Sequence, residues 1–178
     1  PSVQEMRGAW MSFNDLANFN SSSIDAMLDK AVEMNLNTVF VHARAFSDAF
    51  YRSNLFPWSH KLTGVQGQPP AVDPLQYVVD AGHRRGLHVE AWINPYRISN
   101  STDLTYSLAA GNPAVKWQND PSKVIRYEAN GQECMIYNPA SQEVRDLITK
   151  GIIEIIDNYN VDGIHFDDYF YVTGTGED

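Results

Sequence analysis

Apolar and polar positions alternate with two different periods along the 178-residue chain. Runs rich in β-branched and other apolar residues predict buried strands, because such side chains suit a pleated sheet. These runs are residues 7–12, 38–44, 87–94 and 163–167, and residues 124–138 are expected to form a hairpin around Asn130–Gly131. Between them, apolar residues recur three and four positions apart, which predicts helices over residues 24–35, 73–85 and 141–158. This order of elements indicates an α/β fold.

Two of the predicted helices carry an apolar stripe that we expect to face the core. The first stripe is Ile24, Met27, Leu28, Ala31 and Val32, and the last is Val144, Leu147, Ile148, Ile152, Ile155 and Ile156. Residues 21–23, all serine, offer caps for the first helix, while Asp73 with Pro74 begins the second and Gly86 ends it. The long loop over residues 46–70 is of a length that usually indicates function.

Each predicted strand has one apolar face and one face that gathers polar groups, because side chains alternate along a strand. The second face carries Phe40, His42 and Arg44, then His88, Glu90, Trp92 and Asn94, then His165 and Asp167. We expect the apolar faces to meet the helices and the polar faces to meet each other. That is the arrangement of a (β/α)8 TIM-type barrel, whose chemistry lies at the carboxyl ends of the strands. A doubly wound open sheet is the alternative, but it has helices on both faces, and the sequence contains no G-x-G-x-x-G or Walker motif.

The number of strands is smaller than a whole barrel requires. We expect about five, near Arg7, Val39, Val89, Met135 and Ile164, whereas a complete barrel needs about 250 residues. Residues 1–178 are therefore predicted to form a single barrel domain that is incomplete at its C-terminus. An unpaired edge on the last strand would follow.

Composition narrows the classes of partner. The net charge is −9 and the basic residues are scattered, so nucleic acid is not an expected partner. Cys134 is the single cysteine, which leaves no disulfide framework and no cysteine-based zinc cluster. No stretch approaches about 20 consecutive apolar residues, so no membrane span is predicted. The first residues, from Pro1, show no signal-peptide pattern and indicate no compartment.

The stretch DGIHFDDYF, residues 162–170, places two carboxylates at the end of a strand. Asp167 shares a strand face with His165 and, by the expected register, with Glu90. Carboxylates that converge across a barrel mouth are what glycosidic bond cleavage requires, one as acid and the other as nucleophile or base. Structural alternatives remain open: Asp168 as a loop cap, Asp167 as a hydrogen-bond partner of a barrel neighbour, and a salt bridge between Glu90 and Arg44.

Other polar and aromatic residues gather near the strand ends and the long loop. Arg44 is expected to orient a carboxylate or bind a substrate oxygen, or else to pair with an acid in the core. Asn94 and Arg97 follow a strand directly, where a loop presents them to the mouth. Aromatic rings suit the C–H faces of sugars but are also common core residues. Here they are Tyr51, Trp58, Trp92, Tyr96 and Tyr169.

The spacing of residues argues against two other kinds of enzyme chemistry. A metal-dependent deacetylase needs a second histidine pair, but His83 and His88 are separated by Gly86 between a helix and a strand. A Ser-His-Asp hydrolase needs an exposed nucleophile turn, and the sequence has no G-x-S-x-G. We therefore expect neither a metal nor a cofactor.

Four segments together resemble a known family: RGAWMS, HARAFSDAFYRSNLFPWS with LTG, DPLQYVVDAGHRRGLHVEAWINPYR, and DGIHFDDYFY. They resemble the glycosyl-hydrolase-like family 10 domain of bacterial cell envelopes, in order from about Glu5 to Tyr171. The resemblance implies a (β/α)8 barrel on a secreted protein or lipoprotein, with a lipid anchor upstream as one possibility. It also implies glycoside hydrolase chemistry on a bacterial glycan, either peptidoglycan glycan strands or an exopolysaccharide.

The resemblance also carries residue roles onto this chain. The matching positions are Arg44, Asp48, Tyr51, Trp92, Asn94, Tyr96, Arg97, His165, Asp167, Asp168 and Tyr169. The D-G-x-x-x-D pattern resembles the nucleophile strand of α-amylase-type barrels, which implies attack by Asp167. The family usually has HAW where this chain has EAW, so Glu90 departs from the pattern. We thus expect Asp167, Asp168 and Glu90 as catalytic candidates, with the remaining matching positions and His42 binding the carbohydrate. A barrel that binds carbohydrate without cleaving it is the alternative, and a deacetylase is a more distant one.

Overall fold

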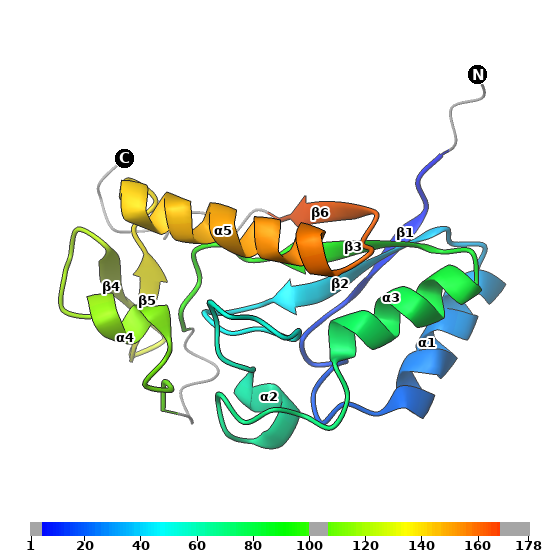
Figure 1. Cartoon of the computed structure of the whole chain (residues 1–178), viewed down its shortest axis with the longest axis horizontal. Coiled ribbons are helices and arrows are strands. Elements are labelled where there is room, and N and C mark those ends of the chain that lie inside the picture. The colour runs from blue at the N-terminus through cyan, green and yellow to red at the C-terminus, as the bar shows by residue number, and fades with distance from the viewer. Residues whose placement is uncertain (1–4, 100–106, 168–178) are drawn as a thin grey trace.

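The computed structural model describes residues 5–99 and 107–167, and a parallel sheet lies at their centre (Figure 1). Its strands are β1 (Gly8–Met11), β2 (Thr38–Arg44), β3 (His88–Ile93) and β6 (Gly163–Phe166), in the order β1-β2-β3-β6. The helices between them are α1 (Ser21–Glu33), α3 (Pro74–Arg84) and α5 (Gln142–Asn158). Short α2 (His60–Thr63) and α4 (Pro113–Trp117) lie in connecting segments, and β4 (Val124–Ala129) and β5 (Gln132–Tyr137) form a hairpin.

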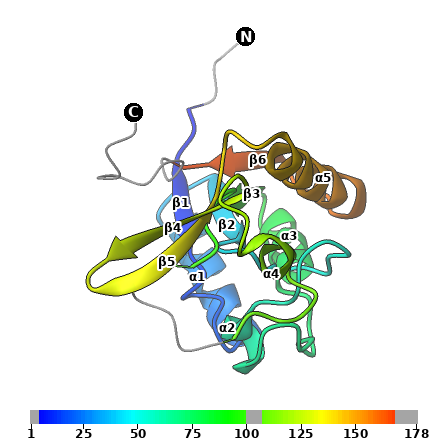
Figure 2. The same ribbon diagram turned by 90° about the vertical axis from the view of Figure 1, so that its left-hand side faces the viewer.

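The three long helices cover one face of this sheet (Figure 2). Each strand pairs in parallel with the next, and a helix connects each strand of the sheet to the following one. This is the repeating unit of a (β/α)8 barrel, so the predicted fold class is confirmed for the part of the chain described. The strands run toward the side that holds β4, β5 and α4 (Figure 1). Their carboxyl ends, where barrel enzymes carry their chemistry, therefore lie on that side.

Local signals account for the helix ends. The side chain of Asn20 accepts a hydrogen bond from the amide of Ser23, so α1 begins at Ser21, earlier than predicted, and the serines form its first turn instead of its cap. Asp73 caps α3 in the same way through the amide of Gln76, with Pro74 in the first turn as predicted. After α3 the chain turns at Gly86, whose positive φ of 73° suits glycine.

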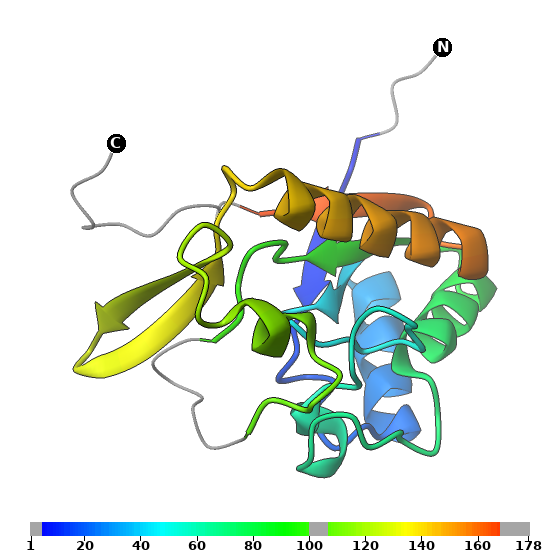
Figure 3. The ribbon, with the colours of Figure 1, turned by 60° about the vertical axis from the view of Figure 1, so that its left-hand side comes forward.

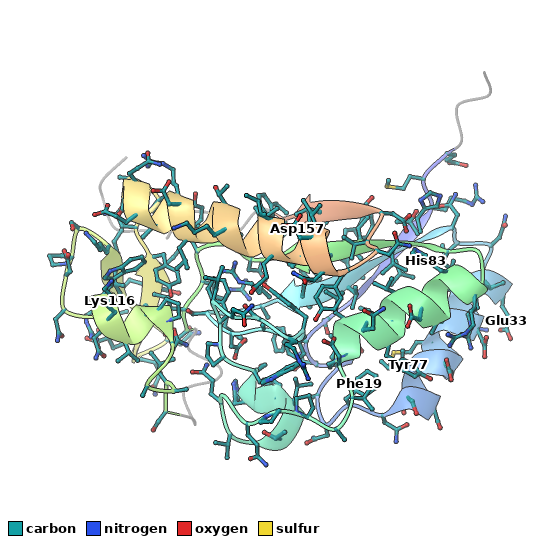
Figure 4. The ribbon with its side chains drawn as sticks, in the orientation of Figure 1. Phe19, Glu33, Tyr77, His83, Lys116 and Asp157 are labelled. Atoms are coloured by element: carbon teal, nitrogen blue, oxygen red, sulfur yellow. The ribbon has the colours of Figure 1, made fainter. Side chains whose placement is uncertain are left out.

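The core lies between the sheet and the helices. The apolar strand positions Val41, Val89, Ala91 and Ile93 are fully buried there. Phe19 and Tyr77, labelled in Figure 4, meet edge to face at 5.4 Å and join the segment just before α1 to α3. Aromatic and aliphatic side chains of this layer hold the helices on the sheet.

Three residues of the predicted apolar stripes face the solvent. Met27 and Val32 on α1 and Ile156 on α5 are exposed. These two helices flank α3, and within the described residues each has a neighbouring helix on one side only (Figure 3). The stripes were correctly assigned as apolar, but the prediction that all their members face the core is wrong.

The strand predicted near Met135 does not join the parallel sheet. It is β5, which pairs antiparallel with β4 through a turn at Asn130 and Gly131, with φ of 53° and 72°. The hairpin is as predicted, because this residue pair favours such a turn. The sheet of the described residues therefore has four strands, not about five, and the amides of Ile98 and Ser99 bond the Met135 carbonyl to tie the hairpin to the segment after β3.

Candidate functional site

The carboxyl ends of β2, β3 and β6 bring a small set of polar residues together. His42 is the register partner of Trp92, and Trp92 is the partner of His165, so these three side chains form one layer across the sheet. Asn94 and Asp167 come directly after β3 and β6 and lie just beyond that layer. Parallel pairing thus places the end of the DGIHFD segment beside the end of the HVEAWIN segment, although about 70 residues separate them.

The carboxylate of Asp167 is held by two donors from β3 and its end. Asn94 Nδ2 donates to Asp167 Oδ2 at 2.6 Å, and Trp92 Nε1 donates to the same oxygen at 3.1 Å. Asn94 is fully buried and Asp167 is half-buried. Hydrogen bonds to an ionised acceptor are short and strong, so they fix the carboxylate in one orientation. The structure therefore presents Asp167 as an oriented, partly accessible anion at the mouth of the sheet.

His42 lies behind this pair. The Phe13 amide donates to His42 Nδ1 at 3.0 Å, and His42 Nε2 lies 2.8 Å from Asn94 Oδ1. Its ring stacks on the Trp92 indole, with centroids 3.4 Å apart and planes within 10°. Burial lowers the pKa of His42 to about 4, against the hydrogen bond to Asn94, which opposes the shift. Near neutral pH the ring is uncharged, and because Nδ1 accepts, Nε2 carries the proton.

Aromatic rings continue the inner face of the sheet from this layer. Trp10 Nε1 donates to His165 Nε2 at 3.2 Å, and the Phe40 ring lies 4.4 Å from the His165 ring. Trp10 is 58% exposed, so a large indole surface is available to a ligand. Trp10 is not among the predicted site residues, although it shares a strand face with Gly8 and pairs with Phe40, which places it on the inner face. The same strand alternation could have found it.

Glu90 lies at the opposite end of the sheet from Asp167. Its register partners are Phe40 and Gly163, and Asp167 follows Gly163 by four residues, which is about 13 Å along the strand. The expected convergence of Glu90 and Asp167 is therefore wrong, because two side chains on the same face of a sheet can lie at opposite ends of its strands. Gly163 leaves room for Glu90, because a Cβ there would lie 3.1 Å from Glu90 Cδ.

Arg44 is also placed differently from the prediction. A register shift between His42 and Arg44 makes Arg44 the partner of Ile93, whose side chain is in the core beneath the helices. Such a bulge moves the following side chain to the other face of the strand. The fully buried guanidinium lies 3.7 Å from the centroid of the Phe56 ring and packs against Gly151 of α5. Arg44 therefore faces the helix layer, which excludes both the mouth and a salt bridge with Glu90.

Asp48 and Tyr51 belong to the long loop, and both side chains are fully buried. Asp48 lies 3.6 Å from His60 Nδ1 and accepts from Gln66 at 3.4 Å, and its side chain has no exposed surface. Tyr51 meets Tyr159 edge to face at 5.6 Å, and burial raises the pKa of Tyr51 to about 12. Neither side chain reaches the surface in this arrangement, so the structure does not support the predicted contact of these two residues with substrate, which stays a prediction.

Four predicted residues remain, and the structure describes two of them, both after β3. Tyr96 and Arg97 are half-buried after β3, and the Arg97 guanidinium lies 5.6 Å from the centroid of the Phe46 ring. Arg97 is near enough to His42 to contribute to its lowered pKa. Asp168 and Tyr169 lie outside the described residues, so their predicted roles stay predictions.

His83 and His88, the two histidines considered as metal ligands, lie at the amino end of the sheet. His83, labelled in Figure 4, contacts Asp162 Oδ2 at 2.8 Å, and His88 lies 3.9 Å from Asp162 Oδ1. Asp162 also accepts from the Val89 amide, and these bonds lower the pKa of its carboxyl although burial opposes them. Across residues 5–99 and 107–167, no group of three or more His, Cys, Asp or Glu side chains is arranged to hold a metal.

Comparison with known proteins gives a family and a fold. The model of the family described as glycosyl hydrolase-like 10 matches residues 5–178. Glycosyl hydrolase YngK of Bacillus subtilis (strain 168) is 44% identical over 146 residues, which is 82% of this chain and 27% of that protein. Glycosyl hydrolase DigH of Escherichia coli (strain K12) is 32% identical over 198 residues, or 98% of this chain and 44% of that protein. The chain thus spans less than half the length of either relative.

A solved structure supports the same architecture. The α-L-fucosidase isoenzyme 2 of Paenibacillus thiaminolyticus aligns with 93% of this chain and 24% of its own, with a TM-score of 0.62 and 15% identity. At that identity the similarity shows the fold alone. In the described part of the chain, no helix is both long and apolar enough to cross a membrane.

Proposed function

The chain belongs to the glycosyl hydrolase-like 10 family, and from that membership we propose that it forms part of a glycoside hydrolase that cleaves a bacterial glycan. The observation that carries the proposal is the carboxylate of Asp167, held by Asn94 and Trp92 at the carboxyl end of a barrel strand. Barrel enzymes place their catalytic groups at this end. Glycosidases act through a pair of carboxylic acids, and Asp167 supplies one of them.

Asp167 has the position of a nucleophile or a general base. As nucleophile, its oxygen would form a bond to the anomeric carbon while the leaving oxygen takes a proton from a second carboxylic acid. As base, it would take a proton from the attacking water. Glu90 is too far away to be that second acid. Asp168, the next residue, remains the proposed partner.

The proposed substrate is a peptidoglycan glycan strand or an exopolysaccharide. The proposed location is the cell envelope or the outside of the cell, with a lipid anchor as one proposed means of attachment. The support is the family resemblance together with the exposed Trp10 indole and the half-buried Trp92 beside the carboxylate. Aromatic faces bury the C–H surfaces of sugar rings and leave the hydroxyls to polar neighbours.

The test is release of sugar from purified peptidoglycan glycan strands and from an exopolysaccharide by the protein that contains this chain. We expect Asp167→Asn to lose at least about 1,000-fold in kcat, because it removes an essential charge but keeps the volume. Glu90→Gln is the matched control: it makes the same chemical change at the other end of the sheet, and activity should stay near that of the wild type. Equal activity of wild type and Asp167→Asn would remove Asp167 from the mechanism. Tight glycan binding by the wild type with no sugar released would instead favour a non-catalytic binding barrel.

A further inference from the structure

The amide of Asn94 has two ends, and only one of them suits Asp167. With Nδ2 toward the carboxylate, the contact at 2.6 Å is a hydrogen bond. Turned by 180°, the amide would place its oxygen against the carboxylate oxygen, and two acceptors repel at that distance. Asn94 is fully buried, so water cannot relieve the wrong orientation. A donor that faces the oxygen end of the amide would reinforce this orientation from the other side.

His42 is placed to select it. The Phe13 backbone amide is always a donor, so His42 Nδ1 must accept and Nε2 must carry the proton. That proton faces Asn94 Oδ1 at 2.8 Å, which fixes the oxygen end of the amide toward His42 and the nitrogen end toward Asp167. His42 is only 2% exposed, and its pKa of about 4 keeps this single tautomer over the neutral range.

The same ring also orients the second donor. His42 stacks face to face on Trp92 with centroids 3.4 Å apart, and Trp92 Nε1 is the other group that donates to Asp167 Oδ2. One buried imidazole thus contacts both side chains that hold the carboxylate. It does not contact Asp167 itself through any hydrogen bond that the structure describes, so it works through its neighbours.

We propose that His42 is a positioning residue, which aligns Asp167 through the Asn94 amide and the Trp92 indole instead of binding carbohydrate. The inference rests on the proposed function only in its consequence for catalysis. A backbone donor, an imidazole, an amide and a carboxylate form a relay from the end of β1 to the end of β6. In this relay, each hydrogen bond determines which atom donates and which accepts in the next one.

The test is a double-mutant cycle on kcat that combines His42→Phe with Asn94→Ala. Phenylalanine keeps a ring against Trp92 but has no nitrogen for the relay. We expect His42→Phe to lower kcat by about 10- to 100-fold with little change in KM, since the carboxylate is misaligned but the sugar surface is intact. In the Asn94→Ala background, the same change should cost less than about threefold, because the amide it orients is gone. Equal costs in the two backgrounds would overturn the proposal.

His165→Phe is the matched control for the cycle. It removes a histidine from the same layer, but the hydrogen bond described for its ring comes from Trp10. Its effect should therefore be the same with and without Asn94. Urea unfolding of each variant gives the folded fraction by which kcat is corrected.

A second readout does not depend on glycan hydrolysis. The side-chain amide signals of Asn94 in a ¹⁵N–¹H spectrum, assigned by their loss in Asn94→Ala, should shift in His42→Phe and stay in place in His165→Phe. Unchanged signals in His42→Phe would overturn the relay. If the wild type releases no sugar from any glycan, the proposed function fails, while the spectrum still decides whether His42 orients Asn94.

Discussion

The buried, uncharged state of His42 makes the stability of the protein depend on pH in a defined window. The pKa of this imidazole is about 4 in the folded protein against an ordinary value of 6.5. Below pH 6.5 the unfolded chain takes up a proton that the folded protein does not accept until the pH nears 4. The free energy of unfolding is therefore undiminished by His42 above pH 6.5 and falls as the pH is lowered through the window. The loss is about 1.4 kcal/mol for each pH unit, or roughly 3 kcal/mol in all.

The environment of the ring supports the direction of the shift. His42 is 2% exposed, and its Nδ1 already accepts the Phe13 amide, so a proton added there would break that bond. Arg97 opposes a positive charge on the ring, while Asp167 and Asp15 favour it less strongly than burial disfavours it. Desolvation is thus the main cause, and it does not depend strongly on salt.

The assay is urea unfolding followed by tryptophan fluorescence, from about pH 7.5 down to about pH 4.5, for the wild type and for His42→Phe. The other titrating groups are the same in both proteins, so the difference between their free energies of unfolding isolates residue 42. That difference should move in favour of His42→Phe by roughly 2.5 kcal/mol between about pH 7.5 and about pH 4.5. Curves that stay parallel across the window would refute a buried neutral imidazole at this position.

Three further outcomes follow from close packing and from the proposed chemistry. Gly82→Ala should destabilise the protein by about 1 kcal/mol, although alanine has the better helix propensity. The reason is that its Cβ would lie 2.6 Å from Cγ2 of Val89, a β-branched side chain that cannot easily rotate away. A raised melting temperature would contradict this prediction. Gly151→Ala should cost a similar amount in a urea titration, as its Cβ would lie 2.9 Å from Phe56, and an unchanged midpoint would show that α5 is less closely packed than described. Sugar release should survive dialysis against a chelator, whereas acetate release that was lost on chelation and returned with added zinc would favour the deacetylase alternative.

The local features of this chain could be predicted from the sequence because short-range physics fixes them. Alternation with a period of two and β-branched runs give strands, and spacings of three and four give helices. Asp73 followed by Pro74 begins a helix, and the pair Asn130–Gly131 adopts the positive φ values of a tight hairpin turn. The parallel barrel unit also follows, since a sheet with one polar and one apolar face needs helices on the apolar face only. The sequence likewise indicates Asp167 at a strand end.

The tertiary structure decided the depth and direction of the side chains. Strand alternation predicts which face of the sheet a side chain lies on, but not how far along the sheet it lies relative to residues of other strands. The distance of Glu90 from Asp167 therefore follows only from the pairing of Glu90 with Gly163. A bulge between β2 and β3 turned Arg44 toward α5, and such a shift depends on how two strands pair, not on either one alone. The relay through His42 joins residues from the ends of four strands that are far apart in the chain. Whether a histidine lies buried and neutral beside an amide is set by its packing, which residue type and spacing do not specify.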